Sequence, residues 1–152
     1  MSQAKTFLKY WLPVVLWMAV VFGASSDAQS GQHSSRIIEP ILRWLFPQMS
    51  AAARDEVVFA CRKVAHVTEY GILALLLWRA LRRPVRRDPR PWNWPLAGWT
   101  VLLAALYAAT DEFHQAFVPT REARVHDVVI DTCGAALALV LLWGWRRWRR
   151  RW

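Results

Sequence analysis

The sequence has few of the residues from which common catalytic and metal sites are built. Its 152 residues include only two cysteines and four histidines, and Cys61 and Cys133 have no metal-ligand spacing. His66 and His114 do not form the paired motif of zinc proteases, and no glycine-framed serine elbow is present. The sequence therefore supports none of the common hydrolase or metal-enzyme classes, and we expect no metal and no cofactor.

Acidic residues are also scarce, with 11 Asp and Glu against 20 Lys and Arg and a formal net charge of +9. Such a charge is compatible with nucleic-acid binding. However, the basic residues cluster between apolar blocks and at the C-terminus, as membrane-topology signals do. No nucleic-acid recognition motif accompanies them. We therefore expect membrane lipids as partners and no nucleic acid.

Apolar residues make up 55% of the chain and concentrate in four blocks of about 18 residues, close to the length that spans a bilayer core. The chain has no internal repeat. These features predict an all-α membrane protein, a four-transmembrane-helix bundle formed by a single domain over residues 1–152. The predicted spans are residues 7–24, 63–81, 94–110 and 127–145.

Two of the four blocks have a competing interpretation or a weak point. The first resembles a signal peptide, because it has a basic start and small residues at its end. Its length and the bulky Trp11 and Trp17 favour a permanent span instead. The second block is the least apolar, because His66, Thr68 and Glu69 interrupt it.

A short amphipathic helix is predicted between spans one and two. Apolar residues recur at helical spacing over residues 37–46, and charged residues occupy the other face. We expect this helix to lie on the membrane surface, after a polar loop at residues 25–35. Pro47 ends it, and Ser50 is the expected N-cap of the next helix.

The positions of the basic residues predict the orientation. The N-terminus, the loop after span two and the C-terminus together carry 13 of the 20 Lys and Arg residues. The positive-inside rule then places both termini in the cytoplasm. The expected location is the bacterial inner, or cytoplasmic, membrane, which the chain crosses several times.

On this topology, all four spans bring polar side chains to the outer membrane level. Glu69 and Asp131 lie one to two turns below the interface, roughly 6–9 Å at 1.5 Å per residue. Ionisable groups at that depth need partners inside a bundle, and Arg121 is placed to fold back over the carboxylates. The predicted cluster consists of Ser25, Ser26, Lys63, His66, Glu69, Tyr70, Asp111, Glu112, Gln115, Arg121, Asp127 and Asp131.

Each member of this cluster also has a structural interpretation. Asp111 and Asp127 can simply mark helix ends, and His66 can be an ordinary interfacial histidine. An ion-pair network that only joins helices is a further alternative. An intramembrane ionisable cluster is nevertheless by default a functional-site hypothesis.

The residues of this cluster resemble the VanZ-like family of bacterial membrane proteins. The similarity rests on Ser25-Ser26, on the stretch from Lys63 to Tyr70, and on the stretch from Asp111 to Arg121, followed by Asp127, Asp131 and Gly134. It covers about residues 7–145 and implies a helical membrane domain with no established reaction. The family's named member is associated with low-level teicoplanin resistance. Thr120 and Asp131 depart from the family pattern, in which Gly and Asn are usual.

Three functions are compatible with these residues. The first is a cell-envelope protein that binds a polar group at the outer leaflet: a lipid head, a cell-wall precursor or a glycopeptide antibiotic. The second is an intramembrane enzyme that acts on a lipid-linked or phosphate-bearing substrate with Asp, Glu and His acid–base or metal chemistry. The third is an oligomeric transporter or proton relay. Because no nucleophile motif is present, we favour binding over catalysis and assign no catalytic residue.

Overall fold

The structure is a computed structural model that describes residues 3–26, 30–83, 88, 90–118 and 124–149. The described residues form helices and no strands, so the all-helical prediction is confirmed. The helices in chain order are α1 (Gln3–Ser26), α2 (Ser30–Leu45), α3 (Ala51–Arg82), α4 (Trp94–Gln115) and α5 (Val125–Arg149).

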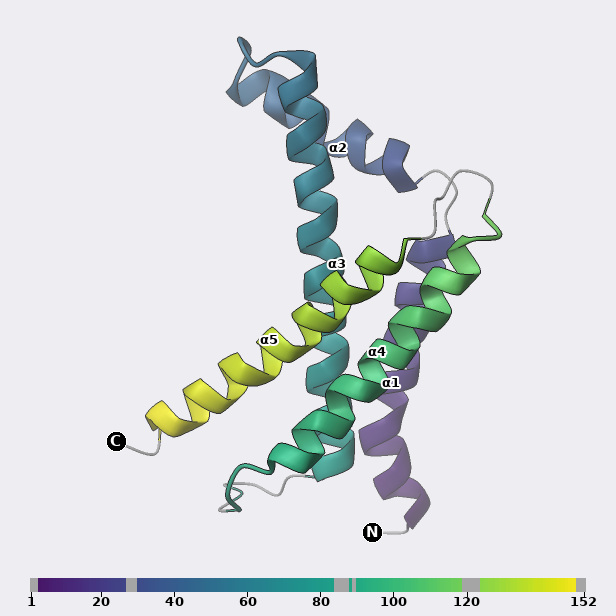
Figure 1. Ribbon diagram of the computed structural model, residues 1–152, viewed down its shortest axis with the longest axis vertical. Coiled ribbons are helices and arrows are strands. Elements are labelled where there is room, and N and C mark those ends of the chain that lie inside the picture. The colour runs from purple at the N-terminus through teal and green to yellow at the C-terminus, as the bar shows by residue number, and fades with distance from the viewer. Residues whose placement is uncertain (1–2, 27–29, 84–87, 89, 119–123, 150–152) are drawn as a thin grey trace.

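The longest helix, α3, is the one around which the others are arranged. It contacts each of α1, α2, α4 and α5 (Figure 1). Its 32 residues span about 48 Å at 1.5 Å per residue, well beyond a bilayer core of about 30 Å. Ser50 caps it as predicted, because the Ser50 hydroxyl accepts a hydrogen bond from the Ala53 N–H at 3.2 Å.

Three described helices are long and apolar enough to cross a membrane: Ala4–Ser25, Ala51–Arg82 and Val125–Arg149. The second predicted span, the least apolar in sequence, is among them. The third, in α4, is not, since tryptophan, proline, glycine, threonine and tyrosine dilute its apolar residues. The structure thus supports membrane helices but does not confirm a count of four.

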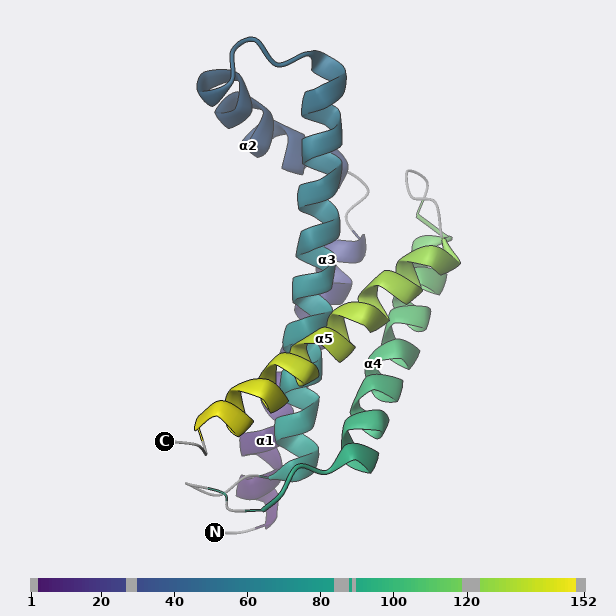
Figure 2. The same ribbon diagram turned by 60° about the vertical axis from the view of Figure 1, so that its left-hand side comes forward.

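The helix α2 is longer than predicted. It begins at Ser30, so residues 30–35 are helical and the prediction of a loop there was wrong. This helix packs beside the first half of α3, away from the crossing of α4 and α5 (Figure 2). Leu42 is buried, whereas Ile37, Ile41 and Trp44 on the same helix are exposed. Only part of its apolar face is therefore covered by the protein.

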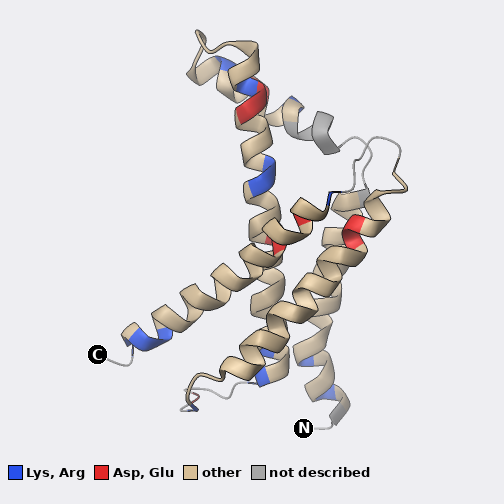
Figure 3. Ribbon diagram, viewed as in Figure 1, with Lys and Arg blue, Asp and Glu red and all other residues tan. Residues whose placement is uncertain are grey.

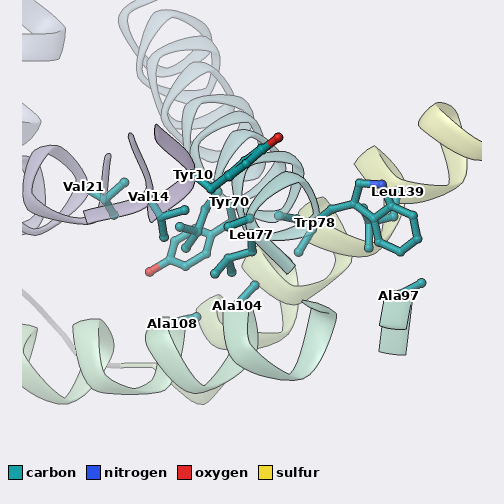
Figure 4. Packing of buried hydrophobic residues seen from close by; sticks show 14 residues of the cluster. Tyr10, Val14, Val21, Tyr70, Leu77, Trp78, Ala97, Ala104, Ala108 and Leu139 are labelled. Carbon is teal, nitrogen blue, oxygen red and sulfur yellow. The ribbon is translucent and has the colours of Figure 1, made fainter. Parts of the chain in front are cut away.

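Small residues dominate the packing where α1, α3, α4 and α5 meet. The core includes Ala74 and Ala80 of α3, Ala104 and Ala108 of α4, and Ala135 of α5. Figure 4 shows Val14 and Val21 of α1 and Tyr70 and Leu77 of α3 in the same core. Small side chains let helix backbones approach closely, which is the usual way helices associate within a membrane.

The closest approach joins α3 and α5 at Gly134. A Cβ placed on Gly134 would lie 2.5 Å from the Val67 carbonyl oxygen and 2.9 Å from the Val67 Cα. One turn further along α3, a Cβ on Gly71 would lie 3.4 Å from the Ala138 Cβ. Gly134 is therefore required by backbone contact, because any larger residue would push α5 away from α3.

We predict that Gly134→Ala destabilises the protein by about 1–3 kcal/mol, the usual cost of overpacking. The matched control is Gly144→Ala in the same helix, where a Cβ meets nothing within 4 Å. There the loss of glycine flexibility should leave stability unchanged or raise it slightly. Thermal melting of both variants in detergent checks this. Equal melting temperatures for the two variants would contradict the close crossing.

The basic connection between α3 and α4 is held by one aspartate. Arg82 is buried, and its Nε lies 2.9 Å from Oδ2 of Asp88, while Arg90 Nε lies 2.8 Å from Asp88 Oδ1. Arg82 also donates to the backbone carbonyls of Arg90 and Pro91, at 2.8 and 3.0 Å. The sequence showed this connection only as a run of positive charge. Among the described residues of the connection, hydrogen bonds to the Asp88 carboxylate join Arg82 and Arg90.

Tryptophan rings continue this structure across three elements. Trp78 of α3 stacks on Trp92 at 4.3 Å between ring centroids, Trp92 contacts Trp94 edge-on, and Trp94 contacts Trp143 of α5. Arg82 lies over the Trp78 ring, where a cation–π contact stabilises the pair. These tryptophans therefore pack against one another and join the end of α3, the start of α4 and the end of α5.

The pairing of Asp88 predicts a pH dependence. The guanidinium groups of Arg90 and Arg82 hold the Asp88 pKa well below its usual range. A lowered pKa in the folded state stabilises the protein fully above the unfolded pKa of about 4, and this stability is lost as pH falls below it. The melting temperature should therefore drop between pH 5 and 3 by more in the wild type than in Asp88→Asn. Parallel pH profiles would show that Asp88 contributes nothing.

Candidate functional site

The polar cluster lies where the end of α1, the middle of α3, the end of α4 and the start of α5 come together. Figure 3 shows acidic residues near the end of α4 and on the first half of α5, while Lys and Arg lie at the start of α1, at the ends of α3 and α5, and also on the first half of α3. The cluster has a buried part around Asp111 and Asp131 and a partly exposed part around Lys63, His66, Glu69 and Asp127.

Asp111 is the centre of the buried part. Its Oδ2 accepts hydrogen bonds from the Ser25 hydroxyl at 2.6 Å, from Gln115 Nε2 at 3.1 Å and from the Tyr70 hydroxyl at 3.4 Å. The donors come from α1, α4 and α3, so one carboxylate oxygen joins three helices. The short Ser25 bond has the length of a strong charge-assisted hydrogen bond, and the Tyr70 bond is weak at its distance.

The second oxygen of Asp111 has a different environment. Oδ1 is buried and has no hydrogen-bond partner among the described residues, and the same is true of Oδ1 of Asp131. An unsatisfied buried acceptor typically costs about 1–3 kcal/mol. Two such atoms in one cluster identify a polar site whose hydrogen bonding the described part of the chain does not complete.

Asp131 faces α3 from α5. Its Oδ1 lies 3.8 Å from Nδ1 of His66, and the same imidazole nitrogen lies 3.9 Å from Oε2 of Glu69. Asp131 is also within electrostatic range of Asp111. When His66 is protonated, it attracts both carboxylates and joins α3 to α5.

Lys63 and Asp127 form the outer ion pair of the cluster. Lys63 Nζ hydrogen-bonds to Asp127 Oδ1, and both side chains are about one-quarter exposed. One turn before Gln115, the Glu112 carboxylate accepts a hydrogen bond from the backbone N–H of Arg124. This bond ties the end of α4 to the residue just before α5.

Two hydrogen bonds from side chains to backbone carbonyls near the cluster were not predicted from sequence. Trp17 Nε1 donates to the Glu69 carbonyl at 2.9 Å, and the Tyr107 hydroxyl donates to the Met18 carbonyl at 2.6 Å. They link α1 to α3 and to α4. Trp17 had been interpreted only as a bulky apolar residue, and no sequence pattern marks a helix carbonyl as the acceptor of a distant side chain.

The predicted residues thus fall into three connected groups. Ser25, Tyr70, Asp111 and Gln115 form the first, His66, Glu69 and Asp131 the second, and Lys63 and Asp127 the third, with Glu112 between α4 and α5. Ser26 is the last residue of α1. Arg121 lies outside the described residues, so its predicted position over the carboxylates remains a prediction.

The arrangement is suited to binding hydrogen-bond donors. The Ser25 hydroxyl donates to a carboxylate rather than to an imidazole, so Ser25 is not arranged as the nucleophile of a Ser–His pair. Within the described ranges, no three His, Cys, Asp or Glu side chains are grouped as metal ligands. The site presents carboxylate oxygens, with a histidine and a lysine beside them.

A family model decides the relationship of this chain to known proteins. The model of the VanZ/LLP1 family matches residues 10–147. The chain belongs to the VanZ/LLP1 family. This match confirms the similarity found in the sequence and covers every residue of the cluster. The comparisons with curated proteins and with solved structures gave no match.

The geometry around Asp111 predicts unequal effects of removing its donors. Ser25→Ala removes the short bond to a carboxylate and should destabilise the protein by about 1.5–3 kcal/mol. Tyr70→Phe removes the bond of 3.4 Å and should cost less than about 1 kcal/mol. Chemical or thermal unfolding in detergent measures both changes. A larger loss for Tyr70→Phe would show that the order of hydrogen-bond strengths is wrong.

Proposed function

We propose that this VanZ/LLP1 protein crosses the membrane four times, with α4 as the third span. The outward side of α4 is apolar: Trp99, Leu102 and Leu106 are exposed, and no charged residue precedes Asp111 in the helix. It also packs against α1, α3 and α5, which are all candidate spans. Because α4 packs beside these helices, it lies in the same bilayer that they cross, and its apolar outward side faces the lipid.

The proposed membrane is the bacterial cytoplasmic membrane, with both termini in the cytoplasm. The basic start of α1, the basic end of α3 and the basic end of α5 point toward the same end of the bundle (Figure 3). Under the positive-inside rule that end is cytoplasmic. The polar cluster then lies toward the outer leaflet.

Reporter fusions test this topology. A reporter fused after Trp152 or within residues 84–87 should be active only in the cytoplasm, and one inserted at residues 119–123 only outside it. Three spans instead of four would place one of these sites on the other side of the membrane. A periplasmic C-terminal reporter would contradict the proposal.

We infer that the function is binding of a polar group at the outer leaflet. The observation that supports it most directly is the buried Asp111 carboxylate, fixed by donors from three helices on one oxygen and free of described hydrogen-bond partners on the other. The candidate ligands are a lipid head, a cell-wall precursor and a glycopeptide antibiotic. Glycopeptides, cell-wall precursors and several lipid heads carry hydroxyl or amine donors, and membership of the family favours a contribution to teicoplanin resistance.

Ligand-induced stabilisation tests the binding function. The purified protein is melted with teicoplanin, with a lipid-linked cell-wall precursor and with a bacterial polar lipid extract, since a ligand that binds only the folded state raises the melting temperature. At least one should stabilise the wild type, and Asp111→Asn should abolish the effect. The matched control is Asp55→Asn, an exposed aspartate on α3 outside the cluster.

Two results would contradict the binding function. One is the absence of stabilisation by any of the three. The other is an equal response from the wild type and from Asp111→Asn, because the ligand would then bind elsewhere.

A further inference from the structure

The open carboxylate oxygens of Asp111 and Asp131 carry information about the ligand itself. Asp111 is 2% exposed and Asp131 is 4% exposed, and in each the Oδ1 atom has no hydrogen-bond partner among the described residues. Both atoms are acceptors. A ligand that bonds to these carboxylate oxygens therefore brings donors.

Hydrogen bonds fix the direction of the Asp111 oxygen, because Ser25 and Gln115 hold Oδ2 of Asp111 from two helices. Asp131 lies on α5 within one turn of Gly134, where the backbones of α5 and α3 are in contact, and its Oδ1 faces Nδ1 of His66 at 3.8 Å. Asp111 therefore presents its acceptor in a fixed direction, as a binding site requires.

The charge of the surroundings favours a cation over a neutral donor. Asp131 is within electrostatic range of Asp127, Asp111, Glu112 and Glu69, and Lys63 is paired with Asp127. A positive group that enters such a concentration of carboxylates is attracted by all of them. The partly exposed side chains of Lys63, His66, Glu69 and Asp127 mark the more open side of the cluster.

The shape of the donor selects among cations. A primary ammonium group carries three N–H donors around one nitrogen, whereas a trimethylammonium group has no N–H at all. Asp111 is four residues before the end of α4, about 6 Å along the helix.

We propose that the site binds the primary ammonium of an ethanolamine-type phospholipid head, through Oδ1 of Asp111 and Oδ1 of Asp131. This proposal rests on the binding function above and specifies its ligand class. Lys63 lies beside the cluster, where it is paired with Asp127. Asp131 supplies the second ammonium acceptor.

The test uses short-chain phosphatidylethanolamine, phosphatidylcholine and phosphatidylglycerol with the same acyl chains, added to the full-length protein in detergent. Melting temperature is measured against lipid concentration. Phosphatidylethanolamine should stabilise the wild type at lower concentration than either other lipid. Asp111→Asn and Asp131→Asn should each weaken its apparent affinity about tenfold or more, the usual effect of losing a charge-assisted hydrogen bond. Asp55→Asn should behave as the wild type.

Equal affinities for the ethanolamine and choline lipids would overturn the proposal, because only the former donates N–H bonds. Equal affinities for the ethanolamine and glycerol lipids would overturn it as well, since a neutral hydroxyl would then suffice. If Asp111→Asn does not fold, Asp131→Asn decides. Stabilisation by teicoplanin or the cell-wall precursor without a preference for phosphatidylethanolamine refutes only this ligand class, whereas no response to any of these compounds refutes the binding function too.

Discussion

The structure depends on how a carboxylate is accommodated among apolar helices. Asp111 is almost fully buried, and burial of a charge is costly unless hydrogen bonds compensate for lost water. The compensation comes from Ser25, Gln115 and Tyr70 on three different helices. The requirement of one side chain therefore determines how the end of α1, the middle of α3 and the end of α4 are placed. Only one carboxylate oxygen of Asp111 is satisfied in this way. The other oxygen has no described hydrogen-bond partner, and it is the basis of the proposed binding function.

Polar contacts hold the two ends of the bundle along α3, and apolar packing holds the part between them. At the level of the cluster, Gly134 lets α5 lie against the Val67 backbone, which brings Asp131 to His66. At the other end, Asp88 and the ring of Trp78 hold Arg82. Between them the core consists mostly of alanine, valine and leucine. The bundle is thus tied at both ends by polar groups and is apolar between them, as a membrane environment requires.

The sequence was sufficient to predict the helices and the family, because apolar blocks and helical spacing depend on local patterns. It also led us to expect a polar cluster, since burial cost forces Asp111 and Asp131 toward partners; the structure brings Ser25 to Asp111 and His66 to Asp131. It did not predict that Ser25 would be the strongest partner of Asp111, nor that Trp17 would bond to a carbonyl of α3. Those contacts depend on the rotation of each helix about its axis. The burial of Arg82 was not predicted either, because a count of basic residues carries no information on burial.

The most direct test of the central claim is a double-mutant cycle between Ser25 and Asp111. The free energy of unfolding is measured for Ser25→Ala, Asp111→Asn and the double variant in the same detergent. If the Ser25 hydroxyl and the Asp111 carboxylate bond as the structure shows, the two changes are not additive, with a coupling energy of about 1 kcal/mol or more. Additive effects within about 0.5 kcal/mol would show that the residues do not interact, and the convergence of α1 and α4 on Asp111 would be wrong.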